Sequence, residues 1–199
     1  MERMKIAIDI DGTLIDCDNF LYRISNKYLS SPTAKSNKKL RYSIIENEND
    51  DKDGLISNII DKFTNMGKVS SYIGKEDSVS LVNAWHESGI IIYLLSSRPN
   101  FASLNRALRE FFNKSNLQYS CMVLHCNNKA KFCNQFHIDL LIDNSPAICK
   151  SVEDEGTDTI CLNSDANKKK KFQDLRFAND WRQIADIVSD IKLEKDKKV

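Results

Sequence analysis

The sequence predicts an α/β fold, a three-layer arrangement in which helices cover both faces of a mostly parallel sheet. From about residue 75 to the end, short apolar runs alternate with segments of helical periodicity. The apolar runs lack the two-residue alternation of half-exposed strands, as expected when both strand faces are covered. Repeated strand, helix and strand units of this kind form parallel sheets with right-handed crossovers.

Five strands and five helices are expected in this part of the chain. The apolar runs that predict strands are residues 5–9, 90–95, 121–125, 140–143 and 159–162. The segments that predict helices are residues 78–88, 102–112, 129–136, 146–155 and 181–191. Gly89 and Gly156 are placed to end two of these helices, Pro146 to begin one, and Asp180 to cap the last.

The stretch between the first and second strands has a different character. Apolar residues repeat at helical spacing around Phe20 and again around Ile59, with no convincing strand between them. Residues 17–74 are therefore predicted to form a small helical cap, inserted into a core of residues 1–16 and 75–193. Residues 194–199 are predicted to be a charged tail that frays.

Composition restricts the classes of function. The chain has 199 residues, 41% hydrophobic and 29% charged, with 6 glycines and 3 prolines. This balance excludes collagen-like, low-complexity and wholly disordered chains. A net charge of +1 favours neither a nucleic acid polymer nor a membrane as partner. The oligomeric state stays open, a homodimer included.

The N-terminus and the cysteines favour a cytoplasmic location. The first apolar run meets acidic residues too soon to be a signal peptide or a membrane-spanning helix. The six cysteines form no C-x-x-C pair. We expect them to be reduced and buried, acting as small apolar side chains.

Polar side chains follow the predicted strands where each strand ends. Ligands of open parallel sheets bind beyond the carboxyl ends of the strands, so these side chains are expected to meet at one edge. They include two aspartates one residue apart, two serines, a lysine that opens a helix and a further aspartate. In chain order they are Asp9, Asp11, Ser96, Ser97, Lys129 and Asp143.

This set suits a phosphate ester held with a divalent cation. Carboxylate oxygens are ligands that Mg²⁺ prefers, while lysine and hydroxyl groups can hold phosphate oxygens. Asp9 would act as the nucleophile, and Asp11 would act as the general acid and then as the general base. Gly12 would let the backbone turn sharply beside the phosphate.

Spacing alone leaves the roles of Lys131 and Arg98 open. Lys131 lies two positions after Lys129 and would be the inward lysine if the helix began later; Asn128 as a helix cap favours Lys129. Arg98 follows the two serines and would either touch substrate or pair with an acidic neighbour.

Four motifs in order resemble those of the haloacid dehalogenase superfamily. They are residues 6–14, ending in Asp9-Ile10-Asp11-Gly12-Thr13-Leu14; residues 94–99, with Ser96-Ser97-Arg98-Pro99; Lys129; and residues 141–144, with Asp143-Asn144. Within it, the second and fourth motifs, the insertion and the late Asn-Asp-Trp look most like the cytosolic type C 5'-nucleotidases, also called 5'(3')-deoxyribonucleotidases.

The resemblance implies a Rossmann-like core with strand order 5-4-1-2-3, a cap over the site and Mg²⁺-dependent hydrolysis of a small phosphorylated metabolite, a nucleotide first of all. It implies an aspartyl phosphate on Asp9, with Asp11 as acid and base. It implies phosphate binding by Ser96, Ser97 and Lys129, and a metal held by Asp9, Asp11 and Asp143, Asp11 using its backbone carbonyl.

The chain departs from the family at two places. Asn144 stands where the family usually has a second Asp, which removes one negative charge from the metal site. Cys17 stands where the animal enzymes have an aromatic that packs on the base. Phe20 is a candidate substitute, as are Tyr22, Tyr42 and Phe63, although packing within the cap is the expected role of each.

Three alternative functions remain open at this stage. The same chemistry would serve a sugar phosphate or another small metabolite, because the cap selects the substrate. A phosphate-binding module with little turnover would fit the charge lost at Asn144. A receiver-type phosphoacceptor domain is disfavoured, because there the acceptor Asp ends an internal strand of the chain and not the first.

Overall fold

The structure is a computed structural model that describes residues 3–16, 74–97, 102–163, 172 and 174–197. The predicted cap, including Cys17 and Phe20, therefore lies outside the described residues apart from its last residue, Gly74. Arg98 lies outside them as well. Among the described residues, no helix is long and apolar enough to cross a membrane.

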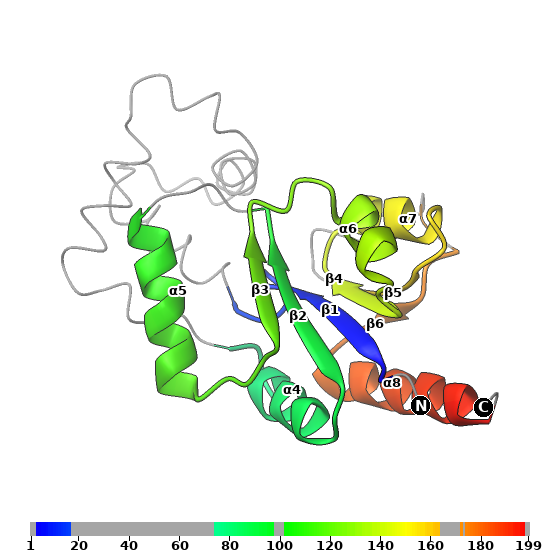
Figure 1. Cartoon of the computed structure of the whole chain (residues 1–199), viewed down its shortest axis with the longest axis horizontal. Coiled ribbons are helices and arrows are strands. Elements are labelled where there is room, and N and C mark those ends of the chain that lie inside the picture. Colours follow the sequence, from blue (N-terminus) through cyan, green and yellow to red (C-terminus); the bar gives the residue numbers. More distant parts are fainter. Residues whose placement is uncertain (1–2, 17–73, 98–101, 164–171, 173, 198–199) are drawn as a thin grey trace.

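A parallel sheet forms the middle layer (Figure 1). Its strands are β1 (Lys5–Asp9), β2 (Ile91–Ser96), β3 (Cys121–Leu124), β4 (Leu140–Asp143), β5 (Asp158–Leu162) and β6 (Phe177–Ala178). They lie in the order β3-β2-β1-β4-β5-β6, and each neighbouring pair is parallel. The predicted order of five strands is confirmed, with β6 added beside β5.

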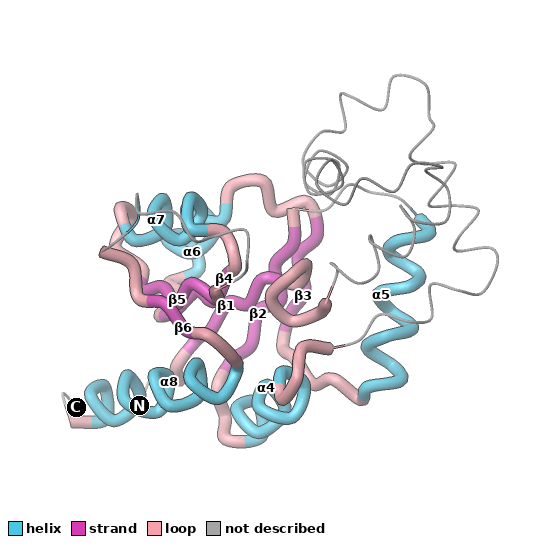
Figure 2. The backbone as a smooth tube through the Cα atoms, turned by 180° about the vertical axis from the view of Figure 1, so that it is seen from behind, coloured by secondary structure: helices cyan, strands magenta, loops and turns pink. Residues whose placement is uncertain are grey.

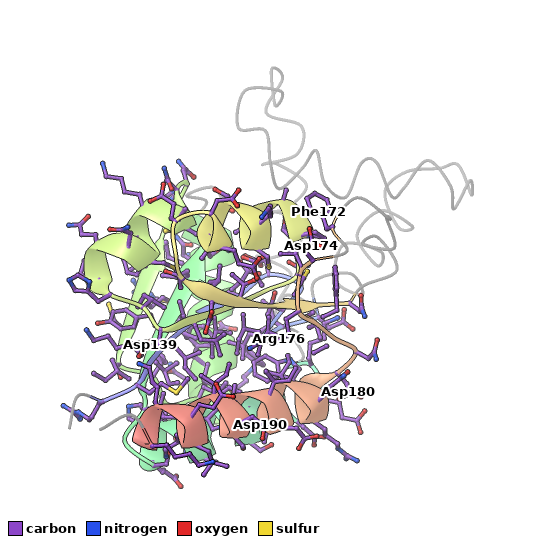
Figure 3. The ribbon with its side chains drawn as sticks, turned by 90° about the vertical axis from the view of Figure 1, so that its right-hand side faces the viewer. Asp139, Phe172, Asp174, Arg176, Asp180 and Asp190 are labelled. Carbon is purple, nitrogen blue, oxygen red and sulfur yellow. The ribbon has the colours of Figure 1, made fainter. Side chains whose placement is uncertain are left out.

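The sixth strand was not predicted because two residues carry no periodic signal. Only pairing with β5 defines it: the Cys161 N–H donates to the Arg176 carbonyl at 2.8 Å, and the Asn163 N–H donates to the Ala178 carbonyl at 2.7 Å. Figure 3 shows this segment running from Asp174 and Arg176 to Asp180, where the last helix begins.

The helices begin where the sequence predicts, and two run further. They are α4 (Ser78–Glu87), α5 (Ala102–Ser115), α6 (Lys129–Phe136), α7 (Pro146–Glu153) and α8 (Trp181–Asp196). The last was predicted to end near Ile191, before a fraying tail. It continues to Asp196 because Lys, Leu and Glu residues in that stretch favour the helix.

Alternate residues of the central strand face opposite helical layers. Ile6 and Ile8 of β1 belong to the larger apolar core, together with buried residues of α4, α5 and α8. Ala7 belongs to a second core with buried residues of α6 and α7. Figures 1 and 2 show α4 and α8 on one side of the sheet and α6 and α7 on the other. The predicted three-layer class is confirmed.

The cysteines follow the prediction with one exception. The five cysteines in the described part of the chain are free, and Cys126, Cys133, Cys149 and Cys161 are buried. Cys121 is exposed, contrary to the prediction. It begins β3, which has β2 as its single neighbour among the described strands and so lies at the edge of the described sheet.

The two flanks of residues 17–73 meet at the core. Ile15 and Gly74 form an antiparallel bridge, and the Lys75 N–H donates to the Leu14 carbonyl at 2.9 Å. The inserted segment therefore leaves and rejoins the core beside the turn that follows β1.

Candidate active site

The turn after β1 brings the first motif to the carboxyl edge of the sheet. The Gly12 N–H donates to the Ile15 carbonyl at 3.0 Å, which folds the chain back on itself. Gly12 has a φ of +85°, and a Cβ atom there would lie 2.4 Å from Nδ2 of Asn144. The positive φ is the reason that this position favours glycine, and the Asn144 side chain of the fourth motif lies close beside it.

Asp9, the last residue of β1, is buried and held at both carboxylate oxygens. Its Oδ1 accepts a hydrogen bond from the Lys129 ammonium at 2.5 Å. Its Oδ2 accepts one from the Thr13 hydroxyl at 3.0 Å. One buried carboxylate is thus oriented by a cation on one side and a hydroxyl on the other.

Lys129 is the lysine that reaches the strand ends. The Asn128 side chain caps α6 by accepting a hydrogen bond from the Lys131 N–H at 2.8 Å, so the helix begins at Lys129. Lys129 is buried in the first turn, whereas Lys131 is exposed. Of the two lysines, Lys129 is therefore the one whose side chain faces inward.

Asp143, at the end of β4, is the second carboxylate that contacts this ammonium. Its Oδ2 accepts from Lys129 Nζ at 2.7 Å, and its Oδ1 accepts from the Ser145 N–H at 2.8 Å. β4 pairs directly with β1, which places Asp143 and Asp9 on neighbouring strands. Lys129 therefore bridges the ends of the first and fourth motifs.

Ser96 and Asp11 join the second motif to the first. The Ser96 hydroxyl, buried at the end of β2, donates to Asp11 Oδ2 at 2.8 Å. Ser97, the next residue, is exposed. The structure thus brings together Asp9, Asp11, Ser96, Lys129 and Asp143 and leaves Ser97 at the surface beside them.

Among the described residues at this edge of the sheet, the acidic side chains outnumber the basic ones. Lys129 contacts two carboxylates, those of Asp9 and Asp143, and a third carboxylate, Asp11, accepts from Ser96 beside them. Burial is the main reason that the pKa of Asp9 is raised to about 7; Lys129 opposes the rise, while Asp143 and Asp11 add to it. Burial alone would lower the pKa of Lys129, but Asp9 and Asp143 outweigh burial and raise it, so the lysine stays protonated.

The donor set fits a magnesium ion. Among the described residues no three His, Cys, Asp or Glu side chains gather closely enough to hold a metal by themselves. Mg²⁺ is commonly bound through one or two carboxylates, with water and substrate phosphate completing the shell. Asp9 and Asp143 supply two carboxylates, and their excess of negative charge is the kind that a second cation would offset.

Thr13 is a site residue that the sequence analysis did not single out. It is fully buried, and its hydroxyl donates to Asp9. Its position in the first motif was visible, but a threonine in a turn normally indicates local backbone bonding. Only the folded turn shows that the hydroxyl points back to the carboxylate four residues earlier.

Comparison with solved structures finds proteins with a similar fold. No protein-family model and no curated protein matches the sequence. A HAD-superfamily hydrolase from Ehrlichia chaffeensis is 12% identical, with a TM-score of 0.53 over 96% of this chain and 98% of that chain. CbbY from Rhodobacter sphaeroides, solved in complex with phosphate, is 12% identical, with a TM-score of 0.63 over 90% and 95%.

An L-2-haloacid dehalogenase is also similar, with 11% identity and a TM-score of 0.58 over 94% of this chain and 100% of that chain. The described core therefore has the fold of the haloacid dehalogenase superfamily hydrolases. The similar structures carry different enzyme names, so the fold alone does not select a substrate.

Proposed function

We propose that this protein is a phosphatase that hydrolyses small phosphomonoesters through an aspartyl phosphate on Asp9. The observation that carries the proposal is the buried Asp9 carboxylate, held between Lys129 and Thr13, with the Asp11 carboxylate two residues further on. Its place at the carboxyl ends of parallel strands is where ligands of such sheets bind. The fold of hydrolases is consistent with it.

The first step transfers the phosphoryl group to the enzyme. One carboxylate oxygen of Asp9 attacks phosphorus, forming an oxygen–phosphorus bond while the bond to the ester oxygen breaks. Asp11 donates a proton to the leaving oxygen, so the product departs as an alcohol. The hydrogen bond from Ser96 to Asp11 orients the acid in the resting enzyme.

The second step returns the enzyme to its starting state. A water molecule attacks phosphorus, and Asp11 accepts a proton from that water. The bond between phosphorus and Asp9 breaks, which releases inorganic phosphate and the free carboxylate. Lys129 and the hydroxyls of Ser96 and Ser97 would bind the phosphate oxygens through both steps, and Arg98 is a further candidate contact.

We propose Mg²⁺ as the cofactor, with Asp9 and Asp143 as carboxylate ligands and Asp11 as a ligand through its backbone carbonyl. Bound there, the ion would neutralise charge on the phosphoryl group. The chain's own contribution is to hold the two carboxylates on adjacent strands and to keep Lys129 between them.

Nucleoside monophosphates are the substrate class that we propose first. The Ser96-Ser97-Arg98-Pro99 motif and the Asp143-Asn144 motif support it through their likeness to the 5'-nucleotidases. Phe20 is the proposed base contact. Sugar phosphates are the second class to test, because the fold does not choose between them.

The test is phosphate release with Mg²⁺ from deoxyribonucleoside and ribonucleoside 5'- and 3'-monophosphates and from sugar phosphates. We expect Asp9→Asn to lower kcat at least about 10³-fold while the circular dichroism spectrum stays unchanged. Asp158→Asn is the matched control, because Asp158 is an exposed carboxylate at the opposite end of the sheet. It should retain wild-type turnover.

The outcomes separate the alternatives. Turnover of nucleotides alone would support the nucleotidase, and turnover of sugar phosphates alone would keep the mechanism with a different substrate. Wild-type turnover in Asp9→Asn would overturn the mechanism. Phosphate binding without any turnover would indicate that the protein is a phosphate-binding module and not an enzyme.

A further inference from the structure

A tryptophan from the far end of the chain reaches the turn that holds the site. Trp181 is the first residue of α8 and is almost fully buried. Its indole Nε1–H donates to the backbone carbonyl of Thr13 at 3.0 Å, across 168 positions of sequence. A buried carbonyl that accepts such a bond is costly to leave without a donor.

Thr13 connects that bond to the reacting group. Its backbone carbonyl accepts from Trp181, and its side-chain hydroxyl donates to Oδ2 of Asp9 at 3.0 Å. Both bonds are buried, so water does not readily replace either of them. The indole therefore sets the position of the residue that orients one oxygen of Asp9.

The indole is itself held firmly. Asp180 caps α8 by accepting a hydrogen bond from the Gln183 N–H at 2.9 Å, which defines the helix start (Figure 3). The Trp181 ring packs on Trp85 of α4, with the ring centroids 6.0 Å apart. The donor thus belongs to a helix packed in the apolar core and not to a surface loop.

The backbone carbonyl of Leu14, the next residue in the same turn, accepts hydrogen bonds from two other donors. Leu14 accepts from the buried Ser78 hydroxyl at 3.0 Å and also from the Lys75 N–H at 2.9 Å. Loss of the Ser78 hydroxyl would leave the Leu14 carbonyl one donor. The Leu14 N–H also donates to the Asp9 backbone carbonyl at 3.3 Å. Among the described residues, however, no hydrogen bond joins Ser78 or Leu14 to the Asp9 carboxylate, so Ser78 is a control for the carboxylate contact alone.

From this geometry we propose that Trp181 is a positioning residue for Asp9 and acts through Thr13. The proposal rests on the proposed function, in which an oxygen of Asp9 attacks phosphorus. A small displacement of an attacking oxygen slows the chemical step far more than it weakens substrate binding. The loss of the indole N–H should therefore appear in kcat.

The first experiment measures hydrolysis of p-nitrophenyl phosphate with Mg²⁺. Trp181→Phe keeps an aromatic ring but removes the donor, and we expect kcat to fall about tenfold with KM changed by less than about twofold. Ser78→Ala should keep kcat within about twofold of wild type. Equal kcat in Trp181→Phe and wild type would overturn the proposal.

The second experiment tests the route through Thr13. Thr13→Ser keeps a hydroxyl and should restore most of the kcat that Thr13→Val loses. In the Thr13→Val background, Trp181→Phe should lower kcat by less than about twofold, because no hydroxyl remains to be positioned. A full tenfold further loss would show that the two residues act independently and would refute the route.

A third measurement needs no turnover, so it distinguishes failure of this proposal from failure of the proposed function. The chain has two tryptophans, and the indole N–H resonance of Trp181 is the one that disappears in Trp181→Phe. In Asp9→Asn that resonance should shift, and the shift should be lost when Thr13→Val is added. No shift would overturn the proposal even in a protein without phosphatase activity.

Discussion

At the scale of single residues, the site is defined by which lysine faces inward. Lys129 and Lys131 differ by two positions, yet only Lys129 is buried between Asp9 and Asp143. The reason is the helix start: Asn128 caps α6, so the first-turn side chain is directed back toward the strand ends. Removal of that ammonium would leave two buried carboxylates without their common partner.

We expect Lys129→Met to lower the free energy of unfolding by about 3 kcal/mol at neutral pH, because the buried Asp9 and Asp143 carboxylates lose their common ion pair and one of them must take up a proton or stay charged without a partner. Lys131→Met, the control at an exposed position, should change it by less than about 0.5 kcal/mol. Urea unfolding of both variants measures the difference. Similar losses in both would mean that the two lysines do not differ in environment.

At the scale of an element, α6 depends on its cap. Asn128 accepts a hydrogen bond from the Lys131 N–H, and the same turn carries Lys129 to the site. The cap is therefore both a local stabiliser of the helix and the feature that sets the direction of a proposed phosphate-binding side chain.

Asn128→Ala should lower the free energy of unfolding by about 1 kcal/mol, the usual cost of losing a helix cap, and should also lower phosphatase kcat. Asn127→Ala is the neighbouring control, because Asn127 is exposed and lies outside the cap bond. Thermal unfolding and turnover of both variants test this. The interpretation is wrong if Asn127→Ala costs as much as Asn128→Ala.

At the scale of the whole molecule, the sheet order brings distant motifs to one edge. β1 lies between β2 and β4, so Asp9, Ser96 and Asp143 come from three adjacent strands. A metal that binds the Asp9 and Asp143 carboxylates would bind only the folded protein. We therefore expect metal binding to raise the free energy of unfolding of the protein.

MgCl₂ at about 100 times its dissociation constant should stabilise the wild type by about 2.7 kcal/mol, which corresponds to a rise in Tm of about 5 to 10 °C for a domain of this size. Asp143→Asn should lose most of that rise. Potassium chloride at matched ionic strength controls for screening. An equal rise in Asp143→Asn would exclude Asp143 as a ligand.

Much of this molecule could be predicted from local patterns. The runs at residues 5–9, 129–136 and 140–143 were expected with the bounds that the structure shows. Apolar periodicity and helix caps depend on residues that are close in sequence, so they can be recognised without knowledge of the fold. The ends of α5 and α8 were set too early because helix propensity continues beyond the apolar pattern.

The sequence by itself determined the three-layer class, the first five strands and the residues at the strand ends, because each rests on spacing along the chain. Only the tertiary structure decided that Lys129 and not Lys131 faces Asp9, that Ser96 bonds to Asp11, and that Trp181 holds Thr13. Each of these contacts joins residues far apart in sequence, and the packing of strands and helices brings them within bonding distance.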